Sequence, residues 1–182
     1  MKFILVRHCE TDWNREWRLQ GHTDTNLSER GWIEADELAQ KLKSFGIKKI
    51  VSSDLKRSRE TASAIKKYVD VPIIYDPRLR ECNFGSLEGK RRSEVSATYI
   101  PSSFDMEGLW HGSYFNYDFT QYGGESRDTV LRRHLSLLDE LLKNDSPEPT
   151  LLIGHGTGIN TLLSHLKKSH IQRGEYAGIE YN

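Results

Sequence analysis

The 182-residue chain has no long apolar run, and it contains only two cysteines. No segment approaches the roughly 18 consecutive apolar residues of a membrane-spanning helix. Two cysteines are too few for the framework of a small disulfide-rich protein. The first residues lead directly into a short strand-like run, without the long apolar stretch of a signal peptide. These absences predict a cytoplasmic protein that does not enter a membrane.

An excess of charge of one sign is also absent, because 26 lysines and arginines balance 26 aspartates and glutamates. Proteins that bind nucleic acids or membrane surfaces usually carry a basic bias. The balance argues against both partners and leaves a small molecule as the expected ligand. The sequence shows no internal repeat, and its length predicts a single domain over residues 1–182.

Short apolar runs alternate with segments of helical periodicity. The strand-like runs are Phe3–Val6, Ile47–Val51, Val71–Tyr75 and Thr150–Ile153, and residues 176–182 could add a last short strand. Helical spacing of apolar residues marks 32–42, 130–142 and 159–166, with Ser28 as the expected cap of the first helix. A further helix would begin at a cap formed by Ser53 or Asp54 and extend through Lys67. The alternation predicts an α/β fold with a mostly parallel sheet covered on both faces.

Residues 90–125 depart from this alternation, because they hold eight aromatic residues but little periodicity. An irregular segment of this length within a compact domain is usually functional or disordered. Its many aromatic residues argue against disorder. We therefore expect this segment to form a partly helical lid.

The most informative residues follow the first apolar run, where the sequence is Arg-His-Cys-Glu-Thr-Asp-Trp-Asn from Arg7 to Asn14. Ligands of open α/β sheets bind outside the carboxyl ends of the strands. A neutral imidazole placed there can attack phosphorus, and a phosphohistidine divides one difficult displacement into two easier ones. The other ring nitrogen must then be held as a donor, and a backbone carbonyl is the expected partner.

This segment resembles the signature of the histidine phosphatase superfamily, or phosphoglycerate mutase-like family, whose usual form is R-H-G-E-T-x-x-N. Five further elements match that family in its order: Arg18–Gly21, Ser52–Ala62, Leu79–Gly89, Gly123–Ser126 and Ile153–Gly156. The resemblance implies a three-layer α/β/α sandwich whose mixed sheet is mostly parallel, with one antiparallel edge strand. It also implies phosphoryl transfer that needs neither a metal nor another cofactor.

The family positions assign His8 as the nucleophile and Glu81 as the general acid and base. Phosphoryl transfer depends on positioning and electrostatic stabilisation. Arg7, Arg57 and a protonated His155 are therefore expected to supply the positive charge around the phosphoryl oxygens. The expected substrate-binding residues are Asn14, Gln20, Gly21 and Thr157.

Cys9 stands where the family usually has glycine. A cysteine would be strained if the position required a positive φ, whereas a small side chain that points into the core would change little. The next residue, Glu10, is expected to orient His8 or Arg7. Glu88 and Glu125 are expected to be mainly structural.

The leading functional hypothesis is a phosphatase that hydrolyses a small phosphorylated metabolite. A phosphoglycerate mutase dependent on 2,3-bisphosphoglycerate shares the first half-reaction and is the alternative. The shortness of the chain and the few basic residues after Arg92 favour the phosphatase. A catalytically inactive binding module is disfavoured because all the catalytic positions are filled. The sequence does not identify the substrate. It also leaves the oligomeric state open, and a homodimer is one of the states that it allows.

Overall fold

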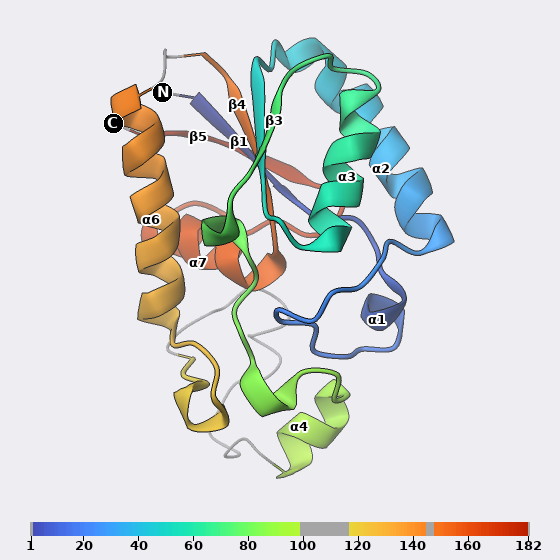
Figure 1. Cartoon of the computed structure of the whole chain (residues 1–182), viewed down its shortest axis with the longest axis vertical. Helices are drawn as coiled ribbons and strands as arrows, with labels where there is room; N and C mark the ends of the chain where they lie inside the picture. Colours follow the sequence, from blue (N-terminus) through green and yellow to red (C-terminus); the bar gives the residue numbers. More distant parts are fainter. Residues whose placement is uncertain (1, 99–116, 145–147, 182) are drawn as a thin grey trace.

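The computed structural model describes residues 2–98, 117–144 and 148–181, and its elements form three layers around a central sheet (Figure 1). The five strands are β1 (Lys2–Arg7), β2 (Lys49–Ser52), β3 (Ile73–Tyr75), β4 (Thr150–Gly154) and β5 (Tyr176–Glu180). Their order is β3-β2-β4-β1-β5, and only β5 pairs antiparallel, at one edge. The predicted α/β sandwich with one antiparallel edge strand is therefore confirmed.

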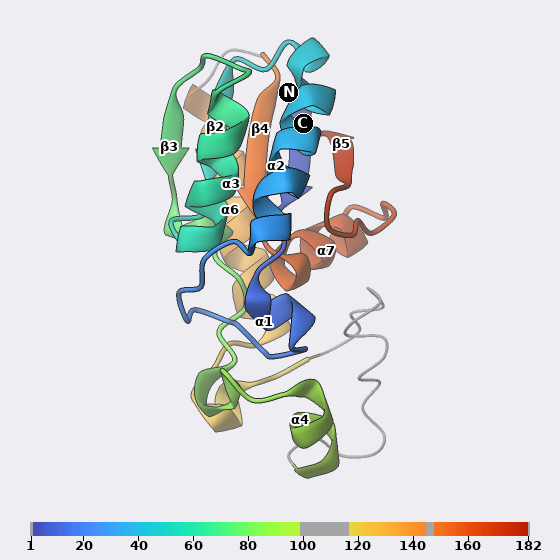
Figure 2. The same ribbon diagram turned by 90° about the vertical axis from the view of Figure 1, so that its right-hand side faces the viewer.

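Helices cover both faces of the sheet (Figure 1). On one face lie α2 (Glu29–Leu42) and α3 (Lys56–Lys66), and on the other lie α6 (Arg127–Asn144) and α7 (Gly156–His165). Two short helices, α1 (Asp12–Arg15) and α4 (Arg92–Thr98), lie beyond the carboxyl end of β1 (Figure 2). The described segments also contain short 3-10 helices, at Lys43–Phe45, Pro77–Leu79, Gly85–Leu87 and Thr120–Tyr122.

The alternation of side chains along β1 divides the apolar core into two parts, one on each face of the sheet. Ile4 and Val6 pack against α2 and α3, whereas Phe3 and Leu5 pack against α6 and α7. Successive side chains of a strand point to opposite faces, so a strand covered on both sides must be apolar throughout. The strand β3 begins two residues later than predicted, because Pro72 has no N–H with which to join the ladder.

The helix caps were predicted with mixed success. Ser28 Oγ accepts the Gly31 N–H at 3.0 Å and caps α2, as expected. The expected cap of α3 by Ser53 or Asp54 is wrong, because the capping position belongs to Leu55, which makes no side-chain bond. The first free N–H of α3 is satisfied from another loop, where Asp24 Oδ1 accepts it at 2.8 Å.

The predicted lid falls largely on residues 99–116, which lie outside the described residues. Its described ends include α4 and two buried aromatic residues, Tyr117 and Phe119. These rings pack with Phe84 and Leu19 in a third apolar cluster. The ends of the segment are thus anchored beside the carboxyl ends of the strands, and the lid itself stays a prediction.

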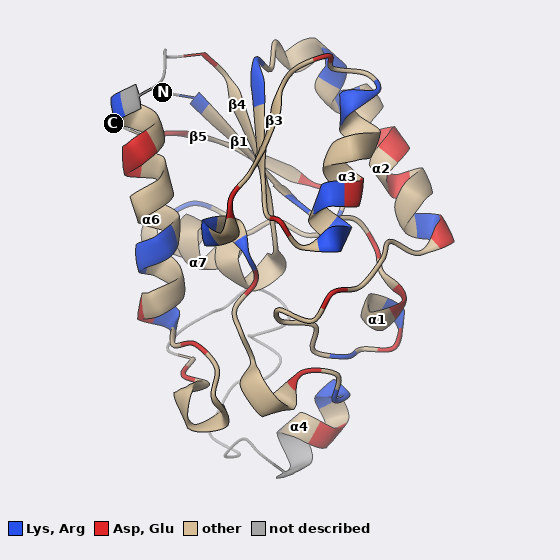
Figure 3. Cartoon of the chain, viewed as in Figure 1, with Lys and Arg blue, Asp and Glu red and all other residues tan. Residues whose placement is uncertain are grey.

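Basic and acidic residues are interspersed over the described ribbon rather than segregated (Figure 3). In this part of the chain, every helix is too short or too polar to cross a membrane.

Candidate active site

The parallel pairing of β1 with β4 places His8 and His155 at the same edge of the sheet. Arg7 lies opposite Gly154 in the register, and the His8 N–H donates to the Gly154 carbonyl at 2.9 Å. The ring centroids of His8 and His155 are consequently 5.0 Å apart. This is the ligand-binding edge of an open α/β sheet.

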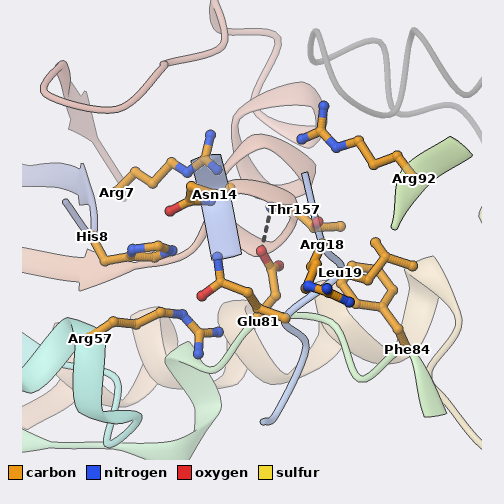
Figure 4. Close-up of a pocket in the computed structure, with 12 residues that line it drawn as sticks. Arg7, His8, Asn14, Arg18, Leu19, Arg57, Glu81, Phe84, Arg92 and Thr157 are labelled. Atoms are coloured by element: carbon orange, nitrogen blue, oxygen red, sulfur yellow. Dashed lines mark hydrogen bonds between the residues drawn. The ribbon is translucent and has the colours of Figure 1, made fainter. Parts of the chain in front are cut away.

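A cavity of about 40 Å³ opens at this edge (Figure 4). Its lining residues are Arg7, His8, Asn14, Arg18, Leu19, Gln20, Arg57, Glu81, Phe84, Arg92, Gly156 and Thr157. Seven of the nine residues predicted from the sequence are in this set, and the other two, Gly21 and His155, lie behind it.

His8 has the charge state and the tautomer of a nucleophile. Its Nδ1 lies 2.7 Å from the Cys9 carbonyl oxygen, which only accepts, so Nδ1 carries the proton and Nε2 keeps its lone pair. Burial lowers the pKa of His8 well below 6.5, and the nearby Arg57 and Arg7 guanidinium groups lower it further. The expected backbone partner is therefore confirmed, and the imidazole is neutral near neutral pH.

Arg57 is fully buried and held by three hydrogen bonds. Its Nη2 donates to the Gly21 carbonyl at 2.7 Å, and its Nη1 donates to the Thr23 carbonyl at 3.0 Å. Its Nε donates to His155 Nδ1 at 3.2 Å. Burial lowers the pKa of Arg57 to about 10, and the Glu81 carboxylate opposes that shift, so the guanidinium stays charged at neutral pH.

Gly21 contributes to the site through its backbone rather than as a residue of the cavity lining. Its φ of +55° is in the left-handed region, and a Cβ atom there would lie 1.9 Å from Glu88 Oε1. Only glycine therefore allows the Gly21 carbonyl to reach Arg57. The structure places this residue as a support for Arg57, and its contact with substrate stays a prediction.

His155 would add a positive charge only if it were protonated, and in this structure its ring nitrogen accepts a hydrogen bond from Arg57. Nδ1 of His155 accepts from Arg57, and Nε2 bonds the hydroxyls of Ser53 at 2.8 Å and Ser58 at 3.1 Å. Burial lowers the pKa of His155 well below 6.5, and Arg57 and then His8 lower it further. A second positive charge beside a buried guanidinium is unfavourable, so the ring is neutral.

Glu81 occupies the amino end of α7. Its Oε1 accepts from the Cys82 and Gly158 N–H groups at 2.9 and 3.2 Å, and its Oε2 accepts from the Thr157 N–H at 3.3 Å (Figure 4). A helix amino terminus favours an anion. The Thr157 N–H that was expected to meet a phosphoryl group thus holds the Glu81 carboxylate in this structure.

Asn14 and Gln20 line the cavity with their amide oxygens already engaged. Asn14 Oδ1 accepts the Thr11 N–H at 3.1 Å, within the cap of α1. Gln20 Oε1 accepts the Thr25 hydroxyl at 2.6 Å. Each amide therefore has its NH₂ end left for a ligand, which suits the expected contact with an anion.

Two arginines in the lining were missed by the sequence analysis. Arg18 opens one of the family-like elements, so the element itself was the signal; its Nη1 donates to the Gly89 carbonyl at 2.7 Å. Arg92 begins α4 in a segment with no motif, and no sequence signal marks it. With Arg7 and Arg57, they make the cavity strongly positive and suited to an anionic ligand.

Two contacts of Glu10 lie away from His8, and the expected orienting role of Glu10 stays a prediction. Glu10 accepts the Ser28 hydroxyl at 2.9 Å and pairs with Arg173 at 3.0 Å, and so joins α2 to the loop before β5.

Cys9 has no positive φ, and its side chain is buried in the core beneath α2 and α3. The Cys9 N–H donates to Thr61 Oγ1 at 3.2 Å, and burial raises the pKa of the thiol to about 12. The position therefore needs only a small side chain. No cluster of metal-ligating side chains occurs in the residues that the structure describes.

The structural role expected of Glu88 is confirmed. Its carboxylate accepts the N–H groups of His22 at 2.8 Å and Thr23 at 2.9 Å, and the Phe84 N–H at 3.2 Å. It therefore braces the loop whose carbonyls hold Arg57. Glu125 has a similar role, because it pairs with Arg133 at 3.0 Å.

The mostly parallel sheet holds His8 and Arg7 at the end of β1, and Arg57 of α3 lies beside them, which is the arrangement expected of a histidine phosphatase. The sequence model of the histidine phosphatase superfamily (branch 1) matches residues 3–182, and the chain belongs to this family. The resemblance seen in the sequence is thereby confirmed.

The chain is 33% identical over 168 residues to the probable phosphoglycerate mutase GpmB of Erwinia tasmaniensis, covering 90% of this chain and 74% of that one. It is 36% identical over 170 residues to the protein of the same name from Yersinia pestis, covering 91% and 74%. Among solved structures, Bacillus stearothermophilus YhfR superposes with a TM-score of 0.85 at 27% identity, covering 100% and 91%. A mycobacterial glucosyl-3-phosphoglycerate phosphatase in complex with VO3 gives 0.83 at 26%, covering 98% and 90%.

Proposed function

We propose that the protein hydrolyses a small phosphate monoester through a phosphohistidine on His8, without a metal or another cofactor. The observation that carries this proposal is the neutral His8 ring, whose Nδ1–H donates to the Cys9 carbonyl, in a cavity lined by four arginines. A free Nε2 lone pair is what attack on phosphorus requires, and fixed guanidinium groups stabilise the charge on the phosphoryl oxygens.

In the first step, His8 Nε2 forms a bond to phosphorus while the bond from phosphorus to the ester oxygen breaks. Glu81, whose carboxylate takes up a proton when the monoanionic ester binds, donates that proton to the departing oxygen, which leaves as an alcohol. In the second step, water attacks the phosphohistidine and gives its proton to Glu81 as the bond between phosphorus and nitrogen breaks. Inorganic phosphate leaves, and His8 and Glu81 return to their starting states.

The test is phosphate release from a panel of phosphomonoesters in EDTA, for wild type, His8→Ala and His165→Gln. His165 is an exposed histidine at the end of α7 and serves as the matched control. We expect release by wild type and the control, and none by His8→Ala. Labelled ester should also leave acid-labile phosphate on wild type but not on His8→Ala. Release that survives His8→Ala would contradict the proposal.

A second candidate is a phosphoglycerate mutase dependent on 2,3-bisphosphoglycerate. It is favoured by the similarity to probable mutases, and by Arg18 and Arg92, which add positive charge for a second anionic group. The two reactions differ in whether water or a substrate hydroxyl accepts the phosphoryl group. Isomerisation of 3-phosphoglycerate only when the bisphosphate is added, with no ester hydrolysed, would support the mutase.

A further inference from the structure

Trp17 is an unusually exposed and strained residue beside the phosphoryl cavity. Its side chain is 60% exposed, and its φ of +57° lies in the left-handed region, which bulky residues rarely adopt. The backbone is held there, because the Trp17 N–H donates to the Asn14 carbonyl and the Trp17 carbonyl accepts the Arg92 N–H at 2.9 Å. Trp17 follows the C-cap of α1, and its left-handed backbone closes the helix while its exposed ring is held beside Arg92.

Arg92 connects this tryptophan to the cavity. Its Cζ lies 4.6 Å from the centroid of the Trp17 ring, while the same side chain lines the phosphoryl cavity (Figure 4). Arg92 also lines a second cavity of about 340 Å³, together with Glu16, Trp17, Arg91 and Ser93. The two cavities therefore share a wall.

The sizes of the cavities indicate how a substrate would be divided between them. The inner cavity, of about 40 Å³, has room for about three water-sized groups at roughly 15 Å³ each, enough for the oxygens of a phosphoryl group. The alcohol portion of an ester must then extend outward. The larger cavity adjoins the inner one at Arg92, and its one large apolar surface is the Trp17 ring.

We propose that Trp17, backed by Arg92, is the subsite for the alcohol portion of the substrate, and that this portion contains a ring with a flat apolar face. The inference rests on the proposed function for the placement of the phosphoryl group. Arg92 covers part of the indole and orients it by a cation–π contact. The exposed remainder offers a flat surface on which an aromatic ring, or the apolar face of a sugar ring, can stack.

The test measures binding rather than turnover. Isothermal titration calorimetry in a His8→Ala background compares phenyl phosphate with methyl phosphate, and glucose 6-phosphate with its open-chain analogue sorbitol 6-phosphate. We expect the ring ligand of at least one pair to bind about 2- to 13-fold more tightly. The pair that shows the difference identifies the ring as aromatic or sugar.

The preference should disappear in Trp17→Gly, which removes the ring and is compatible with the left-handed φ, so that folding is retained. It should persist in Trp17→Phe. The matched control is Trp32→Ala, because Trp32 is also exposed and also lies near a cation, Lys67, but is on α2 away from the cavity.

Equal binding of ring and open-chain ligands, or a ring preference that survives Trp17→Gly, would overturn the subsite while leaving the proposed function intact. Absence of binding by every ester and by inorganic phosphate would overturn the subsite, and it would overturn the proposed function as well if wild type also hydrolysed no ester. Hydrolysis of esters by wild type, measured separately, shows which of the two has failed.

Discussion

The protein should lose stability when the pH is lowered from 7 to 5. Replacing His134 with methionine should make that loss smaller by about 2 kcal/mol. His134 lies in α6 and is 1% exposed. Its Nδ1 donates to the Val130 carbonyl at 2.8 Å, and its Nε2 has no hydrogen-bond partner among the described residues. A proton added to Nε2 would therefore be buried with no acceptor, against the backbone of Gly158.

The magnitude follows from the difference between the folded and unfolded states. Burial, aided by the Arg133 guanidinium, lowers the pKa of His134 from 6.5 to about 3. Below pH 6.5 the unfolded chain binds a proton here that the folded chain does not, so stability is full above pH 6.5 and falls with pH down to about 3. Integrated from pH 7 to pH 5, the loss is about 2 kcal/mol, a large share of the roughly 5–15 kcal/mol of a typical domain. His8 and His155 act in the same direction, so wild type should lose more than this.

The assay is urea denaturation followed by circular dichroism at pH 7 and pH 5, for wild type and His134→Met. Methionine is apolar and flexible enough to fill the space of the ring, so the variant should fold. The exposed His165→Gln is the control and should keep the wild-type loss. If His134→Met loses as much stability as wild type between the two pH values, the buried histidine is not the cause and the reasoning fails.

Two other variants test the site and its departure from the family pattern. Glu81→Gln has no proton to donate, so kcat/KM for alkyl phosphates, which reports the first step, should fall about 10²- to 10⁴-fold. The kcat/KM for 4-nitrophenyl phosphate, whose leaving group needs no proton, should fall much less, and equal losses of kcat/KM would contradict the acid role. Cys9→Gly removes a buried side chain from a position that needs no left-handed φ, and should cost about 1–2 kcal/mol in urea denaturation without raising kcat. A more active Cys9→Gly enzyme would show that the cysteine impairs the site.

The positions of the catalytic side chains were predictable because they depend on local pattern. An apolar run that ends in Arg7 and His8 identifies the carboxyl end of a strand, and parallel strands bring such ends together. The partner of the His8 Nδ1 is the adjacent carbonyl of Cys9, so it too follows from local sequence.

The features that the sequence did not predict depend on contacts between distant segments. The neutral state of His155 depends on its burial and on Arg57, which is 98 residues away. The cap of α3 comes from Asp24, which is 32 residues from the N–H that it accepts. Arg92 enters the cavity only because α4 packs beside the loop of Trp17, and no residue pattern near Arg92 indicates this.

The pairing of β1 with β4 has a consequence for how the protein acquires its activity. This pairing joins the first strand of the chain to one that begins at Thr150, and it fixes His8 through the carbonyl of Gly154. Contacts so distant along the chain form late, because the intervening loop must be ordered first. A nascent chain on the ribosome therefore has its nucleophile long before it has a binding site. Recovery of ester binding during refolding should coincide with the slowest phase of sheet formation.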